Sequence, residues 1–162
     1  MRKWLSLSAI VIALDLLTKH WLQSVLTDGE QRTITSFFNL VLFHNQGAAF
    51  SFLADAGGWQ HIFFSTTAVI ASVVIVYLLR KHSNQNLFCL GLALILGGAL
   101  GNLYDRLTLG YVVDFLYFHY HQYYWPAFNV ADMAISTGIV LLLIDELLLR
   151  KKPALQEKAD LK

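Results

Sequence analysis

The sequence predicts an α-helical integral membrane protein with four transmembrane helices, and composition, apolar runs and flanking charges support this. The chain has 162 residues, of which 56% are hydrophobic and only 14% are charged, whereas soluble domains carry about 25% charged residues. A helix needs about 20 mainly apolar residues to cross a bilayer core of about 30 Å. Residues 4–22, 61–79, 87–107 and 130–149 meet that requirement approximately. We therefore expect one membrane-embedded domain that covers residues 1–162.

Basic residues at the ends of these runs predict the orientation. Residues 2–3, 80–81 and 150–152 are all Lys or Arg, and four crossings place all three groups on one side. Such residues mark the cytoplasmic side of a membrane protein. We therefore expect both termini in the cytoplasm and the connections 23–60 and 108–129 on the outer face.

The two outer connections have different patterns. Residues 33–43 are too few for a fifth span, and residues 38–42 within them alternate like a strand. A turn is expected at 45–47, and the short apolar run 48–53 follows. We expect a small hairpin or sheet on the outer membrane face. The second connection is rich in aromatic residues, which favour the headgroup zone; we expect a loop lying along the membrane, although a carbohydrate or ligand platform is the alternative.

Polar residues inside or near the spans gather at one depth, close to the outer face. An ionisable residue at the centre of a span costs about 2.5–3.5 kcal/mol, so residues of this kind need a reason. They are Asp15, Lys19, Asn102, Asp105, Arg106, Asp114, Asn129 and Asp132. Their convergence at one rim of the bundle makes this rim the candidate functional site.

Asp114 and Asp132 are the candidate catalytic residues within this layer. Asp114 lies in an apolar segment, and Asp132 lies in the first turn of the fourth helix, after the good N-cap residue Asn129. Two neighbouring carboxylates share a proton, so one can activate water while the other donates to a carbonyl oxygen. The alternative is purely structural: one aspartate caps the helix and the other pairs with Arg106.

The remaining polar residues have structural explanations that compete with functional ones. Asn102 and Arg106 share a helix face. The structural explanation is that Arg106 reaches the headgroups or forms an ion pair; the functional one is that it orients the aspartates or binds a lipid phosphate. Asp15 and Lys19 are spaced as a helical ion pair. Asn45 and Gly47 are explained by the turn unless that turn touches substrate. The glycines of residues 96–101 are expected to let another helix approach closely.

Several other chemistries are disfavoured. The one cysteine, Cys89, lies in an apolar run, where we expect a buried hydrophobic side chain. His119 and His121 resemble a metal pair, and a zinc site formed by these two, His44 and a carboxylate is the alternative. The pair lies in the aromatic connection, where histidine is also common, and the sequence has no His-Glu-x-x-His motif, so we expect no metal and no cofactor. No long basic tract suggests a nucleic-acid partner.

Two other functions also use charged residues in membrane helices. An ion-coupled carrier places its site near the midplane, between related halves, whereas these charges lie at one rim and no internal repeat is visible. A non-enzymatic subunit would use the polar layer to hold partner helices. Replacement of each aspartate by asparagine separates these possibilities from an enzyme.

Five short segments together resemble the lipoprotein signal peptidase (signal peptidase II) family. They are residues 15–19 (Asp-Leu-Leu-Thr-Lys), 45–51 (Asn-Gln-Gly-Ala-Ala-Phe-Ser), 97–106 (Gly-Gly-Ala-Leu-Gly-Asn-Leu-Tyr-Asp-Arg), 112–115 (Val-Val-Asp-Phe) and 128–132 (Phe-Asn-Val-Ala-Asp). Each segment alone is weakly specific, but the five in this order, in a four-span chain of this length, are highly specific.

The resemblance implies a bacterial inner-membrane aspartic endopeptidase with a small β-cradle and its active site at the periplasmic face. Its substrates are diacylglyceryl-modified prolipoproteins, cleaved before the lipid-modified cysteine, and its inhibitor is the cyclic peptide antibiotic globomycin. The implied catalytic dyad is Asp114 and Asp132. The implied supporting or substrate-binding residues are Asp15, Lys19, Asn45, Gly47, Asn102, Asp105, Arg106 and Asn129.

Overall fold

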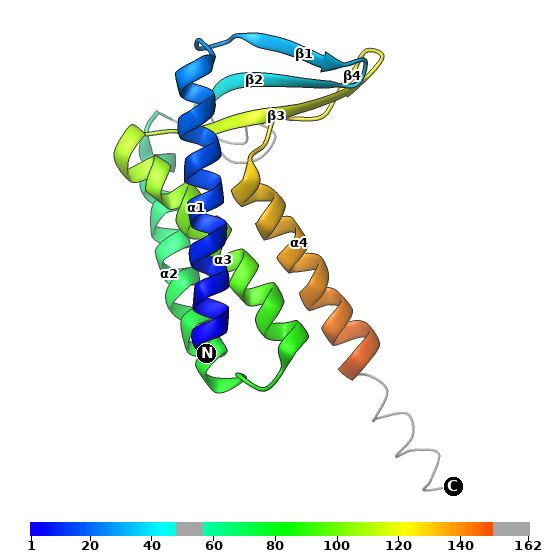
Figure 1. The fold of residues 1–162 in the computed structure, drawn as a ribbon. Coiled ribbons are helices and arrows are strands. Elements are labelled where there is room, and N and C mark those ends of the chain that lie inside the picture. The colour runs from blue at the N-terminus through cyan, green and yellow to red at the C-terminus, as the bar shows by residue number, and fades with distance from the viewer. Residues whose placement is uncertain (48–56, 151–162) are drawn as a thin grey trace, which may run out of the picture.

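The protein consists of a helical bundle with a small antiparallel sheet across one end (Figure 1). The computed structural model describes residues 1–47 and 57–150. The helices are α1 (Arg2–Val25), α2 (Trp59–Lys81), α3 (Asn86–Leu109) and α4 (Val130–Ile144), and a π-helical segment, Asp145–Arg150, follows α4. The strands are β1 (Gln31–Thr35), β2 (Phe38–Asn45), β3 (Val112–Tyr120) and β4 (Tyr123–Tyr124).

Three of the described helices, α1, α2 and α3, are long and apolar enough to cross a membrane. Each extends the predicted run by one or more residues at both ends. The predicted fourth span corresponds to α4 and the π-helical segment. The regular part of α4 has 15 residues, which is shorter than the roughly 20 that a full crossing requires. Four crossings therefore remain a prediction.

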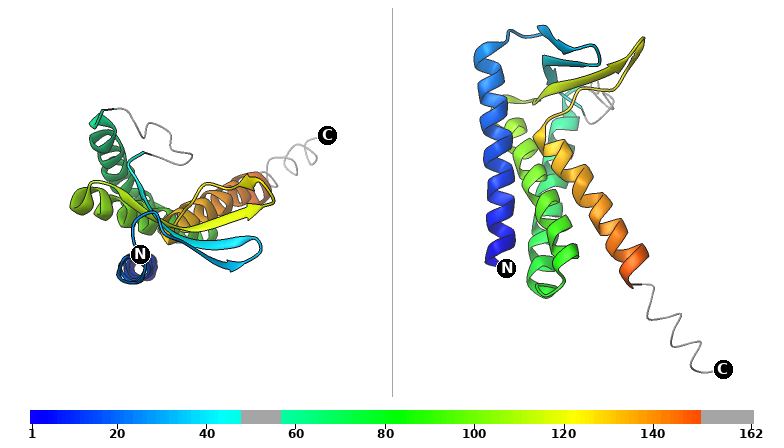
Figure 2. Two further views of the ribbon diagram at one scale, coloured as in Figure 1. Left: turned by 90° about the horizontal axis from the view of Figure 1, so that it is seen from above. Right: turned by 45° about the vertical axis from the view of Figure 1, so that its right-hand side comes forward.

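Helix α3 lies between the other helices and packs against α1, α2 and α4, as the views in Figure 2 show. Its glycines make this possible. A Cβ on Gly97 would lie 2.6 Å from Cβ of Val11 in α1, and one on Gly138 of α4 would lie 2.6 Å from the carbonyl oxygen of Gly91. The prediction that the glycine-rich stretch serves helix packing is confirmed.

The sheet has the order β1-β2-β3-β4, and all its strand pairs are antiparallel. Strand β2 pairs with β1 through a turn at residues 36–37, so the hairpin begins earlier than we predicted. The expected turn at 45–47 instead follows the end of β2. The apolar run 48–53 lies outside the described residues.

The second outer connection is a pair of strands where a loop was predicted. Strand β3 spans nine residues and pairs along β2, and it turns back into β4 at His121, whose φ is +53°. Aromatic residues favour β-strands as well as the headgroup zone of a membrane. In this segment they form strands, and the prediction of a membrane-surface loop was wrong. Pairing with β2 places Asp114 opposite Phe43, and the sheet thus carries one candidate catalytic residue.

The close approach of α3 and α4 predicts how Gly98→Ala changes the stability of the protein. Helix propensity alone and close packing predict changes of opposite sign. In an isolated helix, Gly98→Ala should stabilise by about 1 kcal/mol. Here a Cβ on Gly98 would meet the carbonyl oxygen of Ala131 and lie 2.7 Å from Cγ1 of Ile135. Backbone atoms yield little, so we expect Gly98→Ala to destabilise by about 1–3 kcal/mol.

Thermal unfolding of the detergent-solubilised protein measures this effect. A melting temperature equal to or above that of the wild-type protein would show that α3 and α4 are not in close contact at Gly98.

Candidate active site

The chain between β4 and α4 brings the two candidate aspartates together. After β4 it runs back along β3: the N–H of Phe128 donates to the carbonyl of Leu116 at 3.0 Å, and the N–H of Phe115 donates to the carbonyl of Phe128 at 3.0 Å. This pairing places Asn129, the next residue, beside Asp114. Helix α4 starts at that point, so Asp114 and the first turn of α4 become neighbours.

Asn129 contacts both aspartates. Its Nδ2 donates to Oδ1 of Asp114 at 2.8 Å. Its Oδ1 accepts from the N–H of Asp132 at 2.9 Å, while its own N–H donates to Oδ2 of Asp132 at 3.3 Å. This reciprocal arrangement is a capping box, and it confirms the prediction that Asn129 is the N-cap of the fourth helix. Asn129 is completely buried.

A second amide holds the other oxygen of each carboxyl group. Nδ2 of Asn45 donates to Oδ2 of Asp114 at 2.9 Å, and Nδ2 of Asn102 donates to Oδ1 of Asp132 at 2.8 Å. Oδ1 of Asn45 in turn accepts from the N–H of Gly47 at 2.9 Å, which fixes the orientation of that amide. Both oxygens of both carboxyl groups therefore have an amide donor, so their rotation is restricted.

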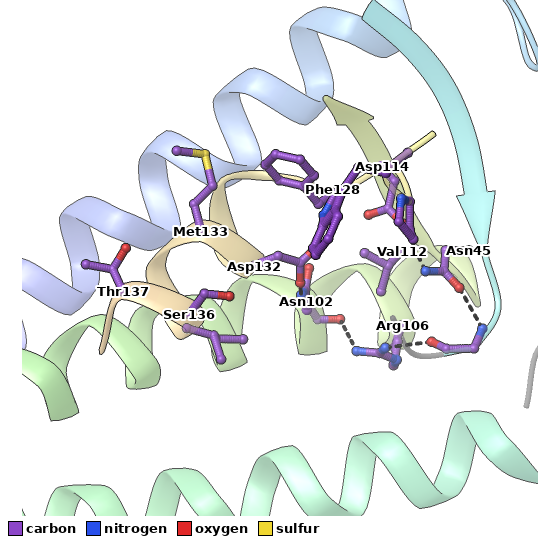
Figure 3. Close-up of a pocket in the computed structure, with 15 residues that line it drawn as sticks. Asn45, Asn102, Arg106, Val112, Asp114, Phe128, Asp132, Met133, Ser136 and Thr137 are labelled. Carbon is purple, nitrogen blue, oxygen red and sulfur yellow. Dashed lines mark hydrogen bonds between the residues drawn. The ribbon is translucent and has the colours of Figure 1, made fainter. Parts of the chain in front are cut away.

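Both aspartates line one cavity of about 610 Å³ at the rim of the bundle, and Figure 3 shows their side chains on its wall. Apolar side chains of the loop before α4 and of α4 itself form much of the remaining wall. The other lining residues are Asn45, Gly47, Asn102, Arg106, Val112, Trp125, Pro126, Ala127, Phe128, Met133, Ile135, Ser136 and Thr137. A cavity of this size with a few convergent polar groups is typical of a ligand site.

Arg106 lies on the same wall but forms no ion pair within the described residues. One Nη donates to the carbonyl of Gly47 at 3.1 Å and the other to the carbonyl of Asn102 at 3.4 Å. The guanidinium also lies 5.2 Å from the ring centre of Phe64. Arg106 therefore does not form the ion pair with an aspartate that the structural alternative proposed, and several of its five N–H donors have no partner among the described residues.

A buried cation supports the site from behind. Nζ of Lys19 lies 2.7 Å from Oδ2 of Asp15, 2.9 Å from Oδ2 of Asp105 and 2.9 Å from Oδ1 of Asn102. The three charged residues are at most 2% exposed. The predicted Asp15–Lys19 ion pair is confirmed, whereas the pairing of Lys19 with Asp105 was not foreseen.

The two carboxylates of this cluster also accept hydrogen bonds from backbone N–H groups next to the candidate aspartates. Oδ1 of Asp15 accepts from the N–H of Ala131 at 2.8 Å, in the first turn of α4. Oδ2 of Asp105 accepts from the N–H of Val113 at 3.1 Å, next to Asp114. The cluster therefore positions both segments that carry the candidate aspartates.

The pKa of Asp114 is raised to about 7. Burial is the main cause, because Asp114 is only 3% exposed, and the nearby Asp132 carboxylate adds to it. The hydrogen bonds from Asn45 and Asn129 act in the opposite direction. Asp114 therefore changes its protonation near neutral pH, which suits acid–base chemistry.

The histidines considered for a metal site lie in other contacts. Nδ1 of His44 is 3.3 Å from Oδ1 of Asp28, and its ring stacks on Tyr111 at 4.0 Å. The ring of His119 packs beside Tyr124. Among the described residues, no three His, Cys, Asp or Glu side chains form a group that would hold a metal ion.

Sequence reasoning missed the wall of the cavity that α4 contributes. Met133, Ser136 and Thr137 line the cavity beyond Asp132 (Figure 3). The sequence does place Ser136 on the same helix face as Asp132, because residues four apart share a face. It does not indicate that this face of α4 borders a cavity.

The raised pKa of Asp114 predicts how one substitution changes stability with pH. Its ionised form is disfavoured in the folded protein, so its contribution to stability is fully present below pH 3.8 and is lost as the pH rises through about 7. Asp114→Asn removes this titration. Relative to the wild type, we expect the variant to gain about 1–3 kcal/mol between about pH 5 and about pH 8.

Melting temperatures of the wild type and the variant are measured in detergent at both pH values. The difference between the two proteins at about pH 8, minus their difference at about pH 5, gives the pH-dependent effect, and effects of the substitution that do not depend on pH cancel. A difference between variant and wild type that stays constant with pH would show that Asp114 is not held neutral by burial.

Comparison with known proteins identifies the family of this chain. The family model described as signal peptidase (SPase) II matches residues 7–148. The lipoprotein signal peptidase of Ralstonia nicotianae is 62% identical over 144 residues, which cover 89% of this chain and 83% of that protein. That of Paraburkholderia phytofirmans is 57% identical over 144 residues, with 89% and 84% covered.

The fold is also shared with solved structures. A structure described as a bacterial membrane enzyme superposes with a TM-score of 0.83 at 28% identity, over 94% of this chain and 93% of that one. A second structure with the same description has a TM-score of 0.79 at 28% identity, over 92% and 94%. The chain is thus a member of the signal peptidase II family of membrane proteases.

Proposed function

We propose that this protein is an aspartic endopeptidase that removes signal peptides from diacylglyceryl-modified bacterial prolipoproteins, cleaving just before the lipid-modified cysteine. Its family membership supports the substrate class. The observation that carries the mechanism is the pair of carboxyl groups, Asp114 and Asp132, fixed by amides on the wall of one cavity.

In this mechanism the two aspartates share one proton and act on one water. We infer that Asp114 holds the proton, because burial raises its pKa to about 7. Asp132 is then ionised, a state favoured by the N–H groups at the start of α4 and by the amide of Asn102. Asp132 takes a proton from the attacking water, and Asp114 donates its proton to the carbonyl oxygen of the scissile peptide bond.

The remaining polar residues act around this pair. Asn45, Asn102 and Asn129 orient the carboxyl groups, and Gly47 orients Asn45. Arg106 lines the cavity with N–H donors that have no partner among the described residues, and these donors suit carbonyl groups of the extended substrate segment. Asp15, Lys19 and Asp105 position the two catalytic segments from behind. No cofactor is needed, because the carboxyl groups carry out both proton transfers.

The proposed position in the membrane follows from the flanking charges. We propose four crossings, with α4 and the π-helical segment forming the fourth, both termini in the cytoplasm and the cavity at the periplasmic face of the inner membrane. The lipid chains of a prolipoprotein anchor its cleavage point at headgroup depth. Asp114 belongs to β3 and Asp132 to the first turn of α4, and the sheet crosses the bundle at the end where α4 begins (Figure 1). Globomycin is the expected inhibitor.

Single substitutions of the two aspartates test the proposal. Asp114→Asn and Asp132→Asn each remove one partner of the acid–base pair, so we expect each to lower the cleavage rate at least about 100-fold. The assay follows cleavage of a diacylglyceryl-modified precursor by the purified protein, with and without globomycin. Helical content and melting temperature report whether each variant folds.

Asp28→Asn is the matched control, because it is the same chemical change at an exposed carboxylate of the α1–β1 connection. We expect it to cleave like the wild type. Substantial cleavage by either folded dyad variant would refute the mechanism. Absence of cleavage by the wild-type protein would instead favour a carrier or a non-enzymatic subunit.

The shared proton also predicts the pH dependence of kcat/KM. Activity requires one proton on the pair, so we expect a bell-shaped profile. The alkaline limb should fall near the pKa of Asp114, about 7, because above it no proton remains for the carbonyl oxygen. The ratio kcat/KM is the relevant quantity, since it is insensitive to slow product release. A rate that stays flat between about pH 6 and about pH 9 would contradict the shared-proton pair.

A further inference from the structure

A second cavity lies between α1 and α2, on the surface of α3. Its volume is about 530 Å³. Leu96 and Leu100 of α3 line it between the two helices, and side chains of α1 and α2 form the walls. These wall residues are Leu5, Ser8, Ala9, Ile12, Ser72, Val73, Val76, Tyr77 and Arg80. It shares no lining residue with the cavity that contains the aspartates. We call it the α1–α2 groove.

The walls of the α1–α2 groove present hydrocarbon. Its two serines bond to backbone carbonyls: Oγ of Ser8 donates to Ala93 at 2.8 Å, and Oγ of Ser72 donates to Ala68 at 2.7 Å. Helices α1 and α2 are both apolar enough to span a membrane. A groove between them therefore opens toward lipid and suits an apolar occupant.

Arg80 is the one charged residue among the described residues that line the groove. It is exposed, and within the part of the chain that the structure describes it has neither an ion pair nor a hydrogen bond to another side chain. It lies at the end of α2, and the basic residues Arg2 and Lys3 begin α1 at the same end of the bundle (Figure 1). Lys81 follows, with Nζ 5.9 Å from the ring centre of Tyr77.

We propose that the α1–α2 groove binds one acyl chain of an anionic phospholipid, whose phosphate is held by Arg80. Arginine suits phosphate because its planar N–H groups match the phosphate oxygens, and basic pockets between membrane helices bind anionic headgroups. The groove volume equals roughly that of a single helical turn about 10 Å wide. A partner helix has several turns and is too large for the groove, whereas a slender acyl chain fits it. This site is independent of the proposed catalytic reaction.

Lipid binding to the full-length, delipidated protein in detergent tests this proposal. Binding of phosphatidylglycerol and of phosphatidylcholine with identical acyl chains is measured by native mass spectrometry and by the rise in melting temperature. We expect the wild type to prefer phosphatidylglycerol about fivefold, as one basic residue at a headgroup would give. Arg80→Gln should reduce this ratio to about one, and Ala9→Phe, which fills the groove from an exposed position, should weaken binding of both lipids severalfold.

Arg2→Gln is the matched control, since it removes one arginine at the same end of the bundle but outside the groove. It should keep the preference. Equal binding of both lipids by the wild type, or an equal loss in Arg2→Gln and Arg80→Gln, would overturn the proposal, because either result shows only diffuse attraction. Dimerisation that Ala9→Phe abolishes would also overturn it, by assigning the groove to a second copy. Cleavage by Arg80→Gln should stay at the wild-type level, which separates this test from that of the active site.

Discussion

The buried cation of Lys19 is the interaction on which the rest of the site depends. It lies between two carboxylates, Asp15 and Asp105, and an amide oxygen, Asn102, at distances of 2.7–2.9 Å. Removal of one partner from such a buried cluster leaves an uncompensated charge and costs about 3–5 kcal/mol. Because the cluster joins α1, α3, β3 and the start of α4, loss of one partner would disturb both segments that carry the candidate aspartates.

Around this cluster the polar groups at the rim form a connected network. Asn102 accepts from Lys19 and donates to Asp132, and Asn129 links Asp132 to Asp114. The position of each carboxyl group is therefore determined by donors that are themselves held in place. In the proposed mechanism, a pair preorganised in this way needs little rearrangement when water and a peptide bond bind. The burial that creates the pair also raises the pKa of Asp114, so the site gains an acid near neutral pH at some expense in stability.

Much of the bundle was predictable from the sequence, because a long apolar run in lipid has few solutions other than a helix. The positions of α1, α2 and α3, the packing role of Gly97 and the cap at Asn129 all follow from local residue chemistry. The convergence of polar residues at one rim followed from spacing and orientation alone. The structure places all ten predicted site residues in one connected region, although their catalytic and binding roles remain predictions.

The parts that could not be predicted depend on contacts between distant segments. Strand β1 pairs with β2, and β2 with β3, through registers that no local pattern specifies. An aromatic stretch fits both a membrane-surface loop and a strand, so β3 was misassigned. The Lys19–Asp105 pair joins two helices whose relative rotation is fixed only in the folded bundle. Ser136 and Thr137 line the cavity because of the position of α4 relative to β3 and α3, which is also fixed only in the folded protein.

The central claim is that Asp114 and Asp132 together retain one proton near neutral pH at the rim of the bundle. Infrared spectroscopy of the purified protein across a pH titration tests it most directly, since a protonated carboxyl group has a C=O band that a carboxylate lacks. We expect such a band at about pH 6, lost as the pH rises through about 7 and absent from Asp114→Asn. No protonated carboxyl band at about pH 6, or one that persists unchanged in Asp114→Asn, would contradict it.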